Sequence, residues 1–158
     1  MPNRRRTEVG FTLVELILVL VLLSLLAAFA ASRFLAPSAY SALAAREQLV
    51  ALLQLAQQRA LAFVDDSQPV SLQLTQSSEA WQVRIQQAAS TLYDERVARD
   101  GAQLQINGVT LANGQVISLT FDGQGRLPES QSWLVQGAST QALCVASSGF
   151  AYAAACQP

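Results

Sequence analysis

The order of apolar and polar residues divides the chain into three regions. Residues 11–31 read FTLVELILVLVLLSLLAAFAA, a run that contains a single charged side chain, Glu15. About 20 consecutive apolar residues are enough to cross a bilayer as a helix. The first region therefore predicts a membrane-spanning helix. A carboxylate inside hydrocarbon costs roughly 2.5–3.5 kcal/mol, so Glu15 is expected to have a partner or a task.

The second region has one apolar face at the i, i+3, i+4, i+7 spacing of an amphipathic helix. Its apolar positions are Leu49, Leu52, Leu53, Ala56, Ala60, Phe63 and Val64. Its polar positions, assigned to the other side, are Arg46, Glu47, Gln54, Gln57 and Gln58. The pattern predicts one long helix from Thr12 to about Val64, kinked at Pro37, whose second half packs on a globular head. The helix is expected to stop at Asp65, Asp66 and Ser67, followed by Pro69.

The third region alternates short β-rich runs with turn dipeptides such as Asn107-Gly108 and Ser148-Gly149. The predicted strands are Val70–Leu74, Trp81–Gln86, Leu104–Ile106, Val116–Phe121, Trp133–Gln136, Leu143–Ala146 and Phe150–Ala153. The polar stretch from Ser90 to Gly101 is interpreted as a connecting loop or a short helix. The glycines of FDGQGR, Gly123 and Gly125, are interpreted as a turn, because a phosphate loop would need a third glycine and a following Lys. The predicted fold is α+β, a long N-terminal helix packed on an antiparallel β-sheet head.

The distribution of charge predicts how the helix is oriented in the membrane and argues against DNA as a ligand. The chain has ten basic residues, all arginine, and three of them occupy positions 4–6. Basic residues before a span favour a cytoplasmic N-terminus, which places the rest of the chain on the outer side of the membrane. Acidic residues outnumber arginines after residue 10, so the head is expected to have no general attraction to DNA.

Two cysteines, Cys144 and Cys156, are predicted to form one disulfide, which implies an oxidising compartment; the alternative is two unrelated buried thiols. A structural zinc site needs about four Cys or His ligands, and the sequence has no histidine. No metal or other cofactor is expected. An enzyme is not expected either, because adjacent carboxylates such as Asp94 and Glu95 read as a solvated loop rather than as an acid–base pair.

The N-terminal region allows three interpretations: a secretory signal peptide, a plain single-pass anchor, and a third that rests on resemblance. The segment RRRTEVGFTLVELILVL resembles the class III signal of type IV prepilins, in which a basic leader and a glycine precede Phe-Thr-Leu-Val-Glu. The resemblance implies that a prepilin peptidase cuts between Gly10 and Phe11 and methylates Phe11. Glu15 is then the fifth residue of the mature chain and meets the N-terminal amine of a neighbouring subunit during assembly.

The same resemblance divides the chain into a leader (1–10), a hydrophobic transmembrane and assembly helix (11–36), an amphipathic helix that continues into the head (37–66) and a β-rich head (67–158). Type IV pilins commonly have a glycine and a proline where this chain has Ser24 and Ser32. Serine breaks a helix far less strongly than either, so the helix is expected to be more continuous. The sequence leaves open whether it melts on assembly.

The long helix, the β-sheet, FDGQGR and the Cys-bounded C-terminal hairpin together resemble the minor pilins and pseudopilins of the GspH/FimT kind. Within them, the opening motif, the helix AREQLVALLQLAQQRAL and the tail LCVASSGFAYAAAC resemble the MshC kind of the MSHA (mannose-sensitive haemagglutinin) pilus. This resemblance implies a structural, assembly-initiating or adhesive subunit of a type IV pilus. The alternatives are a minor pseudopilin of a type II secretion system and a DNA-uptake minor pilin. The implied partners are other pilin subunits, a prepilin peptidase, an inner-membrane assembly platform and its ATPase-driven machinery. The implied location is the inner membrane, with the head in the periplasm, and then the fibre.

Overall fold

The computed structural model describes residues 12–34, 37–62, 68–88 and 90–157, with the side chains of residues 28–39 left out. The chain forms two compact units, Met1–Ala36 and Pro37–Pro158. The first contains helix α1 (Leu13–Phe34), and the second is the head, with helix α2 (Pro37–Ala62) and nine strands among the described residues. The continuity of the predicted long helix depends on residues 35 and 36, which lie outside the described residues.

Helix α1 is unbroken at both positions where the sequence lacks the expected glycine and proline. Ser24 Oγ donates a hydrogen bond of 2.8 Å to the carbonyl oxygen of Val21, one turn earlier, so its hydroxyl is satisfied within the helix. The helix also continues through Ser32. The described residues contain no helix that is both long enough and apolar enough to span a membrane.

Helix α2 begins at Pro37, where the missing N–H of proline costs nothing because the first turn of a helix has no partner for it. The predicted apolar stripe is confirmed where it is described, because Leu49, Leu53 and Ala60 are at most 1% exposed. The predicted positions Phe63 and Val64, and the stop signal at residues 65–67, lie outside the described residues.

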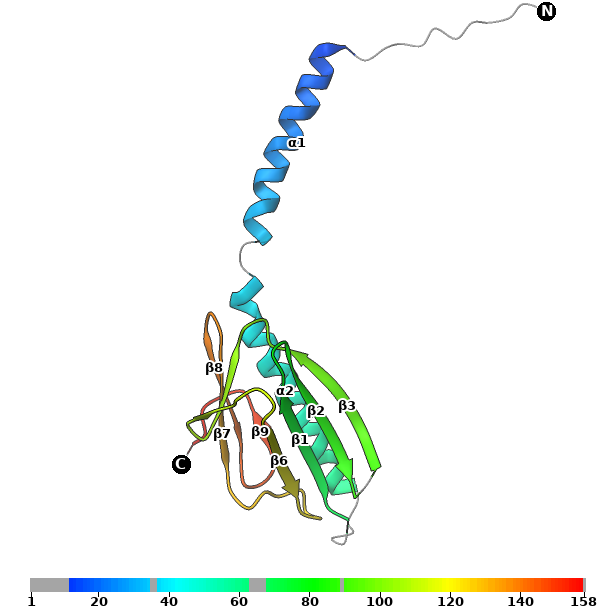
Figure 1. Cartoon of the computed structure of the whole chain (residues 1–158), viewed down its shortest axis with the longest axis vertical. Helices are drawn as coiled ribbons and strands as arrows, with labels where there is room; N and C mark the ends of the chain where they lie inside the picture. The colour runs from blue at the N-terminus through cyan, green and yellow to red at the C-terminus, as the bar shows by residue number, and fades with distance from the viewer. Residues whose placement is uncertain (1–11, 35–36, 63–67, 89, 158) are drawn as a thin grey trace, which may run out of the picture. The chain divides into compact units, whose positions relative to one another are not determined.

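Four antiparallel strands form sheet A, in the order β3-β2-β1-β6 (Figure 1). They are β1 (Val70–Gln76), β2 (Ala80–Gln87), β3 (Ser90–Ala98) and β6 (Val116–Phe121). Along β1 the apolar residues Val70, Leu72 and Leu74 are buried and the residues between them are half-buried. This period of two places one face of sheet A on the core, where α2 contacts β1, β3 and β6.

Five further strands form sheet B, in the order β5-β4-β7-β8-β9. They are β4 (Gln103–Ile106), β5 (Val109–Thr110), β7 (Gln131–Gln136), β8 (Thr140–Val145) and β9 (Ala151–Tyr152). Helix α2 contacts β7, β8 and β9 as well as sheet A, and the buried Trp81 and Trp133 contribute one large side chain to the core from each sheet. The predicted antiparallel head on a helix is confirmed, but its strands form two sheets instead of one.

The segment from Ser90 to Gly101 corrects the prediction of a loop or short helix, since most of it is strand β3. Val97 is buried, whereas residues 90–96 are exposed, so the segment lacks the apolar alternation that marks a strand. The antiparallel backbone ladder with β2 holds this strand in the sheet, and exposed polar pairs lie across the two strands. The Arg84 Nε and Asp94 Oδ2 atoms are 3.0 Å apart. The Arg96 Nη2 atom lies 2.9 Å from Oε2 of Glu79, the residue just before β2.

Asp94 is expected to make the stability of the head sensitive to acid. Gln82 and Arg84 donate hydrogen bonds to its carboxylate and lower its pKa below the ordinary 3.8. Because the folded-state pKa is the lower one, the stabilisation is present above the unfolded-state pKa and is lost as pH falls through the folded-state pKa. In the Asp94→Asn variant, the melting temperature should therefore fall less steeply below about pH 5 than it does in the natural chain. Glu95→Gln removes the same charge one position along and serves as the control; an unchanged acid response in Asp94→Asn would contradict the prediction.

Candidate assembly site

The start of α1 shows how Glu15 is held. Thr12 Oγ1 accepts a hydrogen bond of 3.3 Å from the backbone N–H of Glu15, and the Thr12 carbonyl accepts one of 3.2 Å from Leu16. Thr12 is thus the N-cap of α1, with Glu15 at the third position of the helix. The helix dipole favours a carboxylate at this position. The cap was not predicted from the sequence, although the signal Thr-x-x-Glu is present.

The Glu15 side chain is exposed, and within residues 12–34 its carboxylate makes no ion pair. The processing residues Gly10 and Phe11 lie outside the described residues. The geometry therefore places an exposed carboxylate in the capped first turn of an apolar helix.

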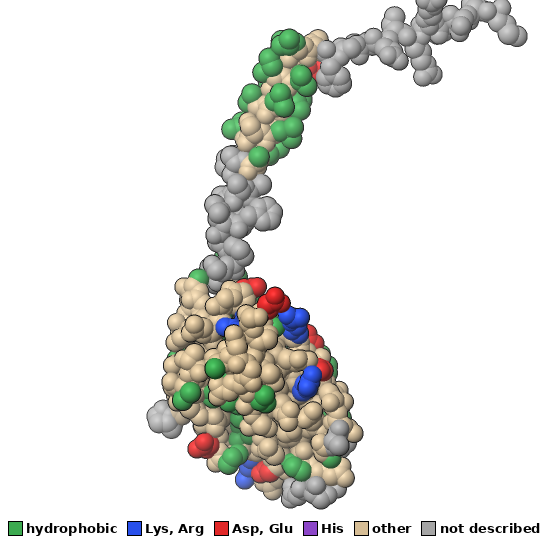
Figure 2. All heavy atoms as spheres, in the orientation of Figure 1, with side chains coloured by type: hydrophobic (Ala, Val, Ile, Leu, Met, Phe, Trp, Pro, Cys, Tyr) green, Lys and Arg blue, Asp and Glu red, His purple; other side chains and the backbone are tan. Residues whose placement is uncertain are grey.

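The apolar side chains of α1 are exposed on all sides of the helix. Between Leu13 and Leu26 every leucine, valine and isoleucine is at least 43% exposed, and Figure 2 shows hydrophobic side chains spread along the coloured part of this helix. A helix that is apolar around its whole circumference is normally buried, in lipid or in protein. An exposed apolar surface of this extent marks a site of protein or membrane interaction.

In the head, Cys144 of β8 and Cys156 form a disulfide, with Cα atoms 4.9 Å apart. The predicted disulfide is confirmed. Cys144 also pairs with Tyr152 across the β8–β9 ladder, so the covalent bond and the sheet hold the same C-terminal hairpin. The disulfide therefore fixes the end of the chain to sheet B.

Removing this disulfide is expected to destabilise the head by about 3 kcal/mol, because a cross-link over a loop of this length restricts the unfolded chain. The double substitution Cys144→Ala with Cys156→Ala, compared by urea unfolding with the oxidised natural chain, measures the loss. The natural chain under reducing conditions is the control and should match the variant to within about 1 kcal/mol. Equal stability of the variant and the oxidised chain would contradict the prediction.

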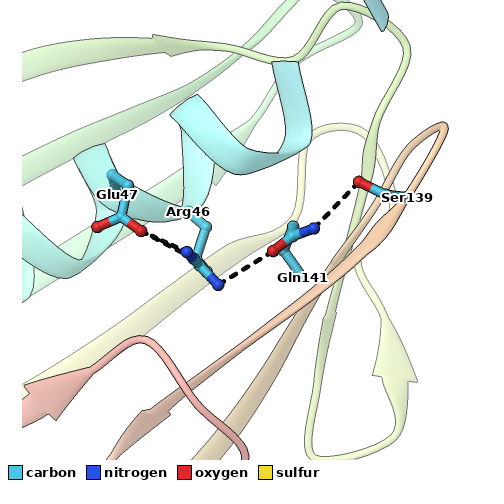
Figure 3. A network of polar contacts seen from close by, with 4 residues as sticks. All are labelled: Arg46, Glu47, Ser139 and Gln141. Carbon is cyan, nitrogen blue, oxygen red and sulfur yellow. Dashed lines mark hydrogen bonds and ion pairs between the residues drawn. The ribbon is translucent and has the colours of Figure 1, made fainter. Parts of the chain in front are cut away.

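Three polar residues predicted to lie on the solvent side of the helix instead contact sheet B or the turn between β8 and β9. We call Arg46, Gln54 and Gln57 the polar seam. Arg46 binds the neighbouring Glu47 and donates a 3.0 Å hydrogen bond to the side-chain oxygen of Gln141 in β8 (Figure 3). Gln141 in turn donates to Ser139 Oγ at 3.1 Å.

The two glutamines of the seam bind backbone carbonyls at the C-terminal hairpin. Gln54 donates to the Ala151 carbonyl and Gln57 to the Ser148 carbonyl, each at 2.9 Å. The sequence assignment failed because α2 packs on two sheets. The arc of the helix in contact with the head is therefore wider than its apolar stripe, and the additional width is polar.

The FDGQGR segment is the predicted turn, closed by Asp122. The Asp122 carboxylate accepts hydrogen bonds from the backbone N–H groups of Gln124 and Arg126, at 2.9 and 2.7 Å. Gly125, with φ +68°, packs on Leu61 and Gln57 near the end of α2. The Gly125 carbonyl oxygen also lies directly against Gly149, in the turn between β8 and β9.

A capped apolar helix joined to a head of one helix on two antiparallel sheets is a pilin-like arrangement, and comparisons with known proteins agree. Residues 6–31 match the family described as "Prokaryotic N-terminal methylation motif", and residues 45–149 match "Type II transport protein GspH". The chain belongs to the GspH family and is a type IV prepilin-like protein of the minor pilin or pseudopilin kind. No curated protein is a significant match to its sequence.

Two crystal forms of the type IV minor pilin FimU from Pseudomonas aeruginosa have a similar structure. The P21 form is 17% identical with a TM-score of 0.53, and the match covers 70% of this chain and 85% of that one. The P65 form is 16% identical with a TM-score of 0.51, covering 70% and 90%. At this identity the likeness concerns the fold, and it confirms the predicted type IV pilin-like architecture.

Proposed function

We propose that this protein is a minor pilin of an MSHA-type pilus, cut between Gly10 and Phe11 and then assembled into the fibre. One observation carries the proposal: the same chain holds a methylation motif over residues 6–31 and a GspH-family head over residues 45–149. The MSHA assignment rests on the likeness of the helix AREQLVALLQLAQQRAL and the tail LCVASSGFAYAAAC to the MshC kind of minor prepilin.

In this proposal Glu15 selects the assembly position. Cleavage gives Phe11 a cationic amine, and residues four apart lie about one helical turn from each other. The Glu15 carboxylate, exposed in the first turn of α1, pairs with the amine of a neighbouring subunit. A buried carboxylate without such a partner is strongly unfavourable, so a subunit in the wrong position keeps a penalty that a correctly placed one loses.

The apolar segment 11–36 anchors the subunit in the inner membrane before assembly and lies in the core of the fibre afterwards. The exposed apolar side chains of α1 suit both environments. The head is then periplasmic, where the Cys144–Cys156 disulfide persists. The partners are other pilin subunits, a prepilin peptidase and an assembly platform. The role is structural, in assembly initiation or adhesion, and does not include catalysis.

A minor pseudopilin of a type II secretion system is the alternative, favoured by the description of the family that residues 45–149 match. DNA capture is less favoured on charge. Arg84 and Arg96 are paired with acids, and Arg99 is 8% exposed and hydrogen-bonded to three oxygen acceptors of the head. These three arginines do not form the cationic strip that phosphate binding needs.

Deleting the gene in the cells that make the protein distinguishes the two candidate functions. Loss of surface fibres, measured in sheared material, with secretion unchanged would support the pilus assignment. Loss of protein secretion with fibres intact would overturn that assignment in favour of the pseudopilin. Restoring either property with the natural chain excludes an effect on neighbouring genes.

A further inference from the structure

The two edges of sheet A differ in how they resist pairing with another strand. At the β3 edge, the pairing of β3 with β2 shifts its register between Ile85 and Gln86 of β2. Strand β3 also carries three charged residues, Asp94, Glu95 and Arg96. Bulges and charges are the usual devices that keep an edge strand from pairing with another chain. The β6 edge reads VISLTF and has neither a charge nor a proline. It is therefore open to another strand.

The hydrogen-bonding pattern shows which residues of β6 face outward. Gln76 N–H donates to the carbonyl of Gln115, its opposite residue, at 3.1 Å. Backbone groups alternate between the two sides of a strand, so Ile117, Leu119 and Phe121 bond to β1. The N–H and C=O groups of Val116, Ser118 and Thr120 then point away from β1, and among the described residues no strand pairs with them.

A groove runs along this outward side of β6. It consists of two adjoining hollows of about 520 and 290 Å³ that share Thr120, Leu127 and Pro128 as lining residues. Leu119, Phe121 and Leu127 contribute apolar side chains to its lining, each at most 7% exposed, beside polar residues such as Ser118 and Gln131. The groove thus combines an open strand edge with a lining that is partly apolar and partly polar.

Residues 126–128, on the other side of the groove, cannot donate to β6. The Arg126 N–H is bonded to the Asp122 carboxylate, the Leu127 N–H to the Ser147 carbonyl at 2.9 Å, and Pro128 has no N–H. The outward groups of β6 are therefore left for a ligand that has its own backbone hydrogen bonds to offer, which is an extended peptide.

We propose that this groove receives an extended segment of a different pilin subunit, which adds to sheet A as a fifth strand beside β6; this inference rests on the proposed pilin function. The segment alternates apolar and polar residues, with its apolar side chains towards Leu119 and Leu127. It is neutral or basic, because Asp122 and Glu129 outnumber Arg126 in the lining.

A second copy of this chain does not supply a matching strand among its described residues. The β3 edge is charged and faces a register shift, and β5 and β9 have two residues each. Pairing of β6 with β6 is symmetric about a two-fold axis, and such an interface closes on itself, whereas a fibre needs contacts that repeat. The ligand is therefore another subunit of the fibre.

Proline at position 118 tests the added strand directly. Ser118→Pro removes an outward N–H but none of the bonds to β1, whereas Ser118→Ala keeps that N–H. In cells that make all the fibre subunits, Ser118→Pro is expected to enter sheared fibres about tenfold less than the natural chain, and Ser118→Ala to within about twofold. Melting of the purified full-length chain checks that the proline variant folds. Entry of a folded Ser118→Pro at the natural level would overturn the groove proposal.

Hydrogen exchange on the unsubstituted chain decides the question if the proline variant does not fold. The amides of Ser118 and Thr120 should exchange about tenfold more slowly in fibres than in the purified detergent-solubilised chain. Equal exchange in both would overturn the proposal, and slow exchange already present in dimers of the purified chain would assign the groove to a second copy and overturn it as well. Complete absence of the natural chain from fibres would instead overturn the proposed function.

Discussion

Replacing Glu15 with leucine is expected to reduce entry of the protein into fibres by about tenfold or more, while membrane insertion and leader cleavage continue. An apolar residue inserts more readily than a carboxylate, which costs roughly 2.5–3.5 kcal/mol inside hydrocarbon. The N-terminal amine of the neighbouring subunit would lose its partner in the fibre. A loss of about 1.4 kcal/mol already corresponds to a tenfold change in an equilibrium.

The structure provides matched controls for this experiment. Thr12 caps α1 through the backbone N–H of residue 15, so side-chain replacement at Glu15 keeps the cap. Glu15→Gln preserves size and removes charge, and it should fail as Glu15→Leu does. Ser24→Leu makes a similar change from polar to apolar on the same helix and should assemble normally. Immunoblots of sheared fibres, normalised to cleaved protein in the membrane, give the comparison; natural levels of Glu15→Leu in fibres would disprove the assigned role.

Gly149→Ala is expected to destabilise the head by about 3 kcal/mol or more. Gly149 has φ +83°, where a side chain costs roughly 1–2 kcal/mol, and a Cβ there would overlap the backbone carbonyl oxygen of Gly125. Both groups belong to turns, one closed by Asp122 and the other leading into β9. Relief of the overlap requires a backbone shift, and overpacking of this kind costs typically 1–3 kcal/mol in addition.

Gly108→Ala separates the overlap from the conformational strain. Gly108 has the same φ of +83°, but an added Cβ there would meet no atom within 4 Å. Its cost should therefore be about 1–2 kcal/mol, the strain alone. Urea unfolding of the purified chain, followed by the fluorescence of the buried Trp81 and Trp133, measures both variants. Equal losses for the two substitutions would show that the contact between the turns contributes nothing.

The elements with strong periodicity were predictable from the sequence. The apolar stripe of α2, including Leu49 and Leu53, is buried as expected, and the turn dipeptide Asn107-Gly108 does separate two strands. Strand β3 was not predictable in this way, because residues 90–96 are exposed and the strand is held by its backbone ladder with β2. That pairing depends on the register with β2, which no local pattern encodes.

The candidate site was predictable where a local motif marks it and not where it depends on packing. Glu15 was identified from its place in the apolar run, although its relation to the Thr12 cap was missed. The disulfide followed from two cysteines in an exported chain. The polar seam could not be predicted, because Gln54 and Gln57 resemble solvent-facing residues until two sheets are placed against one helix. The open edge of β6 likewise depends on the order of strands within the sheet.

The N-terminal mass of the full-length chain after co-expression with a prepilin peptidase shows whether the protein is processed as a prepilin. We expect a mature protein that begins at methylated Phe11 and has lost residues 1–10. A chain left uncut at Gly10, or cut near Ala31, would contradict it. The protein would then be an ordinary anchored or secreted domain, and the assembly role of Glu15 would be disproved with it.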